Sequence, residues 1–133
     1  MKFLEAPYHI LQDALLEYGF IPEFVGRFPV IVPFEALERE EYRAIMTRTR
    51  HSILRQQIAL FALDGVHLEF TEDAIDAIIT QAVQMKSGAR ALRSLVERAV
   101  SKARFELPER GRERVRCIIT AESVESGNYR VEP

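Results

Sequence analysis

Apolar residues spaced three and four positions apart predict two helices in the first half of the chain. The first is predicted over residues 3–19, where Pro7 can start a helix and Gly19 can stop it. The second is predicted as one long helix over residues 37–63. Its main stripe consists of Tyr42, Ile45, Met46, Thr49, Ile53 and Leu60, and it is widened by Leu54, Ile58 and Phe61.

The same spacing predicts two further helices in the second half of the chain. One follows Thr71, a favourable N-cap residue. The residues on its predicted inward face are Ala74, Ile75, Ile78, Ile79, Ala82 and Val83. The other begins at Ser87-Gly88 and ends at Leu107-Pro108. It turns inward Leu92, Leu95, Val96, Ala99, Val100 and Ala103.

Strands are predicted where apolar and polar residues alternate. Two strands are predicted most clearly. The apolar positions of the first are Val66, Leu68 and Phe70, and those of the second are Val115, Cys117 and Ile119. Shorter strands are predicted at Val30-Ile31-Val32, which reads as buried, and around Tyr129 and Val131. A charged turn is expected at residues 109–114 and one turn of helix at residues 121–126.

The chain is expected to divide near residue 33. Residues 1–33 contain only one helix, one turn and one short strand, so we expect them to be the end of a larger fold whose beginning is missing. Residues 34–133 contain three main helices beside a few strands, which predicts an α+β domain with a small sheet.

Composition excludes several classes of function. The 18 Lys and Arg residues against 20 Asp and Glu give a net charge of -2, so no general positive field would attract nucleic acid or an anionic membrane. Arg48, Arg50 and Arg55 lack interleaved aromatic residues and are interpreted as a solvated helix face. No apolar run approaches the ~20 residues of a membrane-spanning helix, and the only cysteine cannot form an internal disulfide. We therefore expect a soluble, cytoplasmic protein.

Motifs for independent catalysis are absent from the sequence. It contains neither Gly-x-x-x-x-Gly-Lys-Ser/Thr nor Gly-x-Gly-x-x-Gly, the loops that hold nucleotide phosphates. His9, His51 and His67 have no second metal ligand at helical spacing. Cys117 has no histidine placed beside it by the sequence, which favours a buried thiol over a nucleophile.

Two isolated arginines are the remaining candidates for chemistry. Arg90 lies in the first turn of the fourth predicted helix, where a cation is unfavourable unless an anion is bound there. The helical spacing places Arg90 roughly opposite the apolar face, so its side chain is free to meet a ligand. Arg27 is the only cation in a dense apolar segment. Each arginine alone is a weak signal, because most surface arginines have no measurable role.

Three segments resemble, in order, the ClpX family of AAA+ unfoldases. Residues 18–30, YGFIPEFVGRFPV, resemble the segment FGLIPEFIGRLPV of that family. Residues 60–70, LFALDGVHLEF, resemble LFNLEGVDLEF, and residues 86–94, KSGARALRS, resemble KTGARGLRS. The HslU family has similar IPE, GR and GAR segments, but residues 23–27 and 64–70 match ClpX better.

The resemblance implies that residues 1–33 end an AAA+ large domain and that residues 34–133 form the small, or sensor-2, domain. Arg27 stands at the position of the family's arginine finger, which faces the nucleotide of the neighbouring subunit. Arg90, preceded by Gly88 and Ala89, stands at the sensor-2 arginine, which contacts the phosphates of the nucleotide bound by its own subunit. Ile45 and Met46 would lie near the adenine. The implied cofactor is ATP with Mg²⁺, which this chain alone is not expected to bind tightly.

The implied partners are the neighbouring subunits of a homohexamer, together with a ClpP-type peptidase and protein substrates bound through regions outside this chain. Because both Walker motifs are absent, we expect the C-terminal fragment of an ATP-dependent unfoldase that supplies nucleotide sensing and subunit packing without hydrolysing ATP by itself. The alternative is a free-standing helical protein-interaction module, in which Arg27 and Arg90 meet the acidic surface of a partner.

Overall fold

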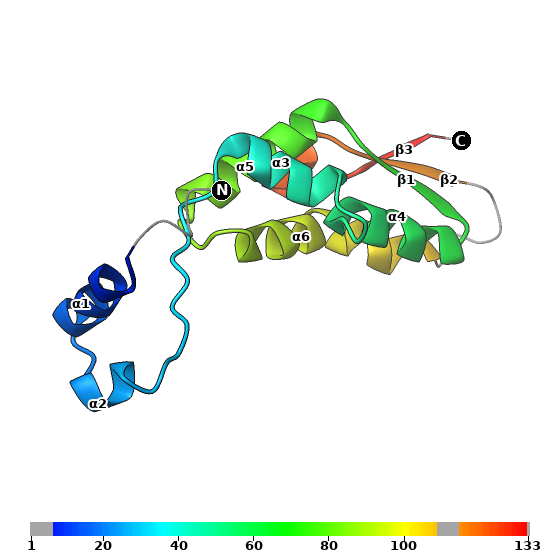
Figure 1. Cartoon of the computed structure of the whole chain (residues 1–133). Helices are drawn as coiled ribbons and strands as arrows, with labels where there is room; N and C mark the ends of the chain where they lie inside the picture. Colours follow the sequence, from blue (N-terminus) through cyan, green and yellow to red (C-terminus); the bar gives the residue numbers. More distant parts are fainter. Residues whose placement is uncertain (1–6, 109–114, 133) are drawn as a thin grey trace. The chain divides into compact units, whose positions relative to one another are not determined.

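The computed structural model describes residues 7–108 and 115–132. The chain divides into two compact units, the N-terminal unit (residues 1–36) and the C-terminal unit (residues 37–133) (Figure 1). The charged turn predicted at residues 109–114 lies outside the described residues. None of the helices in the described ranges combines the length and the apolar character that crossing a membrane requires.

The N-terminal unit contains, in its described part, the helices α1 (Tyr8–Tyr18) and α2 (Pro22–Val25). The helix predicted over residues 3–19 is confirmed in its described part. It ends at Gly19, which has a left-handed φ of 116° and donates its N–H to the Leu16 carbonyl at 3.1 Å. Pro22 is the first residue of α2, a position where its missing N–H leaves no hydrogen bond unmade.

The strand predicted at Val30-Ile31-Val32 is wrong. These residues have no regular secondary structure, and Val30 and Val32 are 71% and 57% exposed. A strand needs a neighbouring strand to receive its backbone hydrogen bonds, and the described residues of the N-terminal unit contain none. The apolar run therefore lies on the surface of this unit.

The described residues of the C-terminal unit form five helices and a three-stranded sheet, which confirms the predicted α+β class. In chain order the elements are α3 (Arg39–Thr47), α4 (Ile53–Leu63), β1 (Val66–Phe70), α5 (Glu72–Gln84), α6 (Arg90–Glu106), β2 (Val115–Ile119), α7 (Ala121–Ser126) and β3 (Arg130–Glu132). The sheet order is β1-β2-β3, with β1 parallel and β3 antiparallel to β2. The strands predicted from alternation and the helical turn at residues 121–126 are thus confirmed.

The single long helix predicted over residues 37–63 is wrong, because the chain turns between α3 and α4. Ser52 begins α4: its Oγ accepts the N–H of Arg55 at 3.4 Å, and its side chain is completely buried. Before the turn, Thr47 and Thr49 donate their hydroxyls to carbonyls four residues back and so complete the end of α3. Apolar spacing alone does not register these polar signals.

Helices cover one face of the sheet and enclose the core (Figure 1). The fully buried side chains include Met46, Leu68, Ile78, Leu92 and Cys117. The inward faces predicted for α5 and α6 are confirmed except for Val83, which lies exposed in the last turn of α5. Leu60, Ile58 and Thr49 were predicted to lie on the stripe of one helix, but they are exposed. The new start at Ser52 makes Ile53, Gln57 and Phe61 the buried line of α4.

Replacing Ser52 with alanine is expected to lower the free energy of unfolding by about 1–2 kcal/mol, because it removes the cap of α4. Chemical denaturation of the two proteins measures the difference. Ser101→Ala is a matched control: Ser101 is exposed, and its hydroxyl bonds only to its own helix. That variant should stay within about 0.5 kcal/mol of the parent. Equal stability of the Ser52 variant and the parent would contradict the capping role.

Cys117 gives the C-terminal unit a distinct loss of stability in alkaline solution. Burial raises the pKa of its thiol from the ordinary 9.0 to about 11. The unfolded chain therefore releases this proton at lower pH than the folded protein does. The contribution of Cys117 to stability is complete below pH 9 and is lost as the pH rises toward 11.

We expect the stability gap between the parent and Cys117→Ala to narrow as the pH is raised through this range. Urea unfolding of both proteins at pH 8 and at pH 10.5 measures it, and the other titrating groups cancel in the comparison. A gap that is the same at both pH values would show that the thiol ionises equally well in the folded state.

Candidate functional site

A surface hollow of about 450 Å³ lies in the C-terminal unit at the turn between α3 and α4. One wall comes from the end of α3, the turn and the start of α4, and the other comes from the start of α6. Its lining residues are Ile45, Thr49, His51, Ile53, Ala89, Arg90 and Arg93. The break that apolar spacing fails to predict is therefore the feature that shapes this site.

The start of α6 is set by the five residues that follow α5. Lys86 and Gly88 both adopt left-handed backbone angles, with φ of 50° and 64°. Gly88 has open space around its missing Cβ, so the backbone angle rather than crowding favours glycine there. Ala89 is the N-cap of α6 without a capping side chain, and the first turn holds no acidic residue. Arg90 is the first residue of the helix.

The hollow is electrically positive, although the chain as a whole carries a net charge of -2. Two guanidinium groups line it, and no carboxylate is among the lining residues. Arg90 is exposed and has no hydrogen-bond or ion-pair partner within the described part of the chain. Arg93 donates to Gln56 Oε1 at 3.1 Å and lies 3.7 Å from Glu97. This set of groups suits an anion that also has a flat apolar part, because Ile45, Ile53 and Ala89 complete the lining.

The hollow brings together only some of the residues that the sequence singled out. Ile45, Ala89 and Arg90 line it, and Gly88 immediately precedes them in the chain. Met46 is fully buried in the core and is not a lining residue. Four other lining residues are not predicted as site residues from the sequence: Thr49, His51, Ile53 and Arg93. Arg93 could have been found, because residues three apart on a helix share a face.

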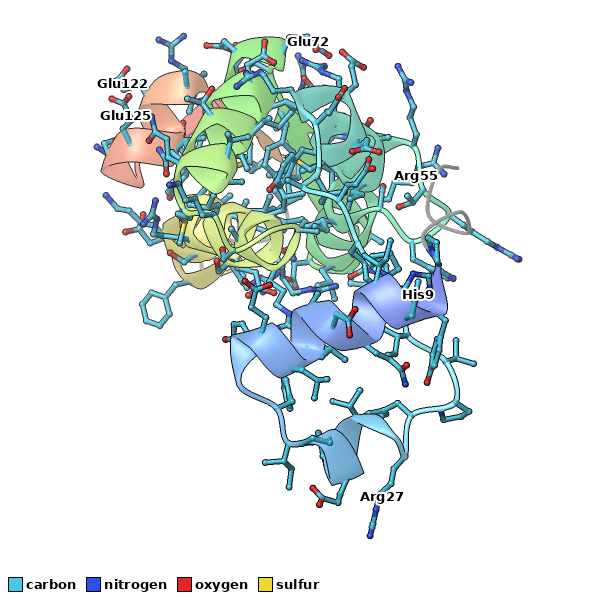
Figure 2. All side chains as sticks on the ribbon, turned by 60° about the vertical axis from the view of Figure 1, so that its left-hand side comes forward. His9, Arg27, Arg55, Glu72, Glu122 and Glu125 are labelled. Atoms are coloured by element: carbon cyan, nitrogen blue, oxygen red, sulfur yellow. The ribbon has the colours of Figure 1, made fainter. Side chains whose placement is uncertain are left out.

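Arg27 belongs to the N-terminal unit. It follows α2 in a short turn, where its N–H donates to the Phe24 carbonyl at 3.1 Å. Figure 2 shows its side chain projecting away from the ribbon of this unit, and it is exposed. Within the described residues it has no hydrogen-bonding or charged side-chain partner. Its guanidinium is therefore available to a ligand or partner.

Aromatic side chains support the turn that carries Arg27. The rings of Tyr18, Phe20 and Phe24 stack in sequence with centroids 5.8 and 5.6 Å apart, and Phe28 meets Phe24 edge-on at 4.9 Å. An apolar hollow of about 240 Å³ adjoins these rings; its lining residues are Leu15, Phe20, Phe24, Val25, Phe28, Val30 and Ile31. Arg27 thus extends from a turn that is flanked by packed aromatic rings.

The histidine, cysteine and acidic side chains in the described ranges offer no metal site. Across residues 7–108 and 115–132, no three His, Cys, Asp or Glu side chains come together as metal ligands would. Cys117 is buried in the core as predicted, and its raised pKa makes the thiolate scarce at neutral pH. His67 pairs with Glu69 at 2.9 Å on the face of the sheet that the helices leave open.

The fold and the hollow can now be placed among known proteins. A family model for the C-terminal, D2-small domain of ClpB protein matches residues 37–119, beginning where the C-terminal unit begins. The chain belongs to this family, and its α+β fold is that of an AAA+ C-terminal small domain.

A particular relative extends the likeness beyond the C-terminal unit. It is the ATP-dependent Clp protease ATP-binding subunit ClpX 3 of Methylococcus capsulatus, which is 40% identical over 116 residues. The match covers 87% of this chain and 26% of the relative. The chain is thus ClpX-like in sequence and spans about a quarter of that protein's length.

Proposed function

We propose that this chain is the nucleotide-sensing C-terminal part of an ATP-dependent protein unfoldase. The observation that carries the proposal is the hollow, which combines Arg90 and Arg93 with an apolar lining and has no lining carboxylate. The name of the ClpX 3 relative describes that protein as an ATP-binding subunit. The ligand that fits both observations is a nucleoside polyphosphate.

The chain's own residues suit ATP in a specific way. The guanidinium of Arg90, which has no competing partner in the described ranges, would pair with phosphate oxygens. Gly88 and Ala89 would bring the backbone of the α6 start close to the same ligand, and Ile45, backed by buried Met46, would contact the adenine. No lining carboxylate is present to hold Mg²⁺, so the ion would have to be held by the phosphates and by groups outside this hollow.

Arg27 would act on a different nucleotide from the one that Arg90 contacts. Its exposure and the packed aromatic rings beside its turn fit an arginine finger that stabilises charge on a transferring phosphoryl group in a neighbouring subunit. This role requires an oligomer, which we propose to be a homohexamer. Residues 1–33 would then be the end of the AAA+ large domain.

Hydrolysis would need groups that this sequence does not contain, since it has no phosphate-cradling loop. The chain would instead report nucleotide state through contacts that differ between domain arrangements. The relative's name includes the words Clp protease, which supports a ClpP-type peptidase as partner and proteins as substrates. The setting that we propose for this activity is the cytoplasm.

A chimera separates the roles of the two arginines. The matching 116-residue stretch of the M. capsulatus ClpX 3 is replaced by that of this chain, and steady-state ATP turnover and nucleotide affinity are measured. Arg27→Ala is expected to lower kcat by about a hundredfold or more and to leave nucleotide affinity near the parent value. Arg90→Ala is expected to weaken nucleotide affinity about tenfold, because a charged hydrogen bond is lost.

The control for both variants is Arg98→Ala. Arg98 lies on α6, donates to Gln81 at 2.9 Å and is not a lining residue of the hollow. Replacing Arg98 with alanine should leave both the kcat for ATP and the nucleotide affinity unchanged. If the Arg27 variant has the kcat of the parent and the Arg90 variant has its nucleotide affinity, the roles proposed for the two arginines are wrong.

A further inference from the structure

One glutamine side chain links the two walls of the hollow. Gln56, on α4, donates its Nε2 to the His51 carbonyl at 3.0 Å, and its Oε1 accepts from Arg93 Nη2 at 3.1 Å. The carbonyl needs a donor and the guanidinium needs an acceptor, so only one orientation of the amide satisfies both. Gln56 therefore ties the α3–α4 turn to the first turns of α6.

Arg93 keeps most of its hydrogen-bonding capacity despite this bond. A guanidinium has five N–H donors, and Gln56 takes one of them. Glu97 lies 3.7 Å away in an ion pair whose two side chains are 54% and 48% exposed, and such a pair contributes little. The remaining N–H groups can serve a ligand in the hollow that Arg93 lines.

Arg90 and Arg93 are one helical turn apart and line the same hollow. Residues at this spacing have Cβ atoms about 5–6 Å apart, so two guanidiniums can engage different oxygens of one polyphosphate. We infer that Arg93 is a second phosphate-binding residue of this site and that Gln56 is the residue that positions it. The inference rests on the proposed nucleotide function and adds a contact to it.

The same helix offers a matched pair outside the hollow. Arg98 donates to Gln81 of α5 at 2.9 Å, so it repeats the bond between Arg93 and Gln56. Neither Arg98 nor Gln81 is a lining residue. Alanine at Arg98 therefore removes the same net charge and the same kind of bond as alanine at Arg93, but outside the hollow.

The test measures dissociation constants of the 133-residue chain for Mg·ATP and for inorganic triphosphate by NMR titration at millimolar ligand. Arg93→Ala is expected to weaken both about fivefold or more, and Arg98→Ala to change them by less than about twofold. Arg93→Lys should give an affinity between those of the parent and Arg93→Ala, because lysine keeps the positive charge but lacks the planar set of N–H donors of a guanidinium. The amide spectrum of each variant checks that the fold is retained.

Substitutions of the two glutamines test the positioning role. Gln56→Glu would place a carboxylate on Arg93 and compete with the phosphates for it, so triphosphate affinity should fall by about threefold or more. Gln81→Glu changes the net charge by the same amount beside Arg98 and should leave affinity unchanged. Equal effects of the two glutamate variants would overturn the positioning role.

The outcomes separate this inference from the proposed function. If Arg90→Ala weakens binding while Arg93→Ala binds like the parent, the inference is wrong and the nucleotide function stands. If Arg98→Ala weakens binding as much as Arg93→Ala, the effect is general charge and the inference is wrong. If the parent chain binds neither ligand, the proposed nucleotide function of the hollow and this inference fall together.

Discussion

A buried serine hydroxyl fixes the arrangement of the C-terminal unit. Ser52 caps α4, so the chain turns between residues 47 and 53 instead of continuing as one helix. The turn lets α3 pack on α5, where Arg43 donates to Glu72 and Asp76 at 2.7 and 2.6 Å, while α4 packs on β1 and α6. A straight helix could not contact both sets of partners. The hollow lies at this turn, and its shape therefore depends on the cap.

Local charge, rather than the charge of the whole molecule, gives the hollow its chemistry. The net charge is -2, yet the lining has two guanidiniums and no carboxylate. Arg90 and Arg93 lie on the wall that the start of α6 forms. Gln56 joins this wall to the opposite one, because its Oε1 accepts from Arg93 and its Nε2 donates to the His51 carbonyl. A ligand can shift the arrangement of domains only through contacts that differ between the arrangements. An open hollow at the surface of a small domain can supply such contacts, because the opposite side of the ligand is left for another domain.

The sequence was most informative where one physical effect decides the structure. Period-two and helical spacing located β1, β2, α5 and α6, because burial against the core sets their pattern. Apolar spacing fails to predict the structure where a polar group ends the pattern. Within residues 37–63, Ser52 caps α4 and so divides the predicted helix in two. Apolar character also fails to predict the structure of Val30-Ile31-Val32, because a strand needs a partner strand and the described part of that unit has none. Arg90 can be singled out from its position on a helix, and Arg93 from its helical spacing to Arg90, but His51 enters the site only through the turn that apolar spacing does not predict.

We propose that the hollow between the α3–α4 turn and the start of α6 holds the phosphates and base of a nucleotide. The most direct measurement is a map of the backbone amides of this chain that shift when Mg·ATP is added. Nucleotide binding in the hollow predicts that the perturbed amides cluster at residues 45–53 and 88–93, and that the amides on the open face of the sheet around His67 do not shift. Shifts confined to other surfaces, or no shifts at millimolar nucleotide, would contradict it.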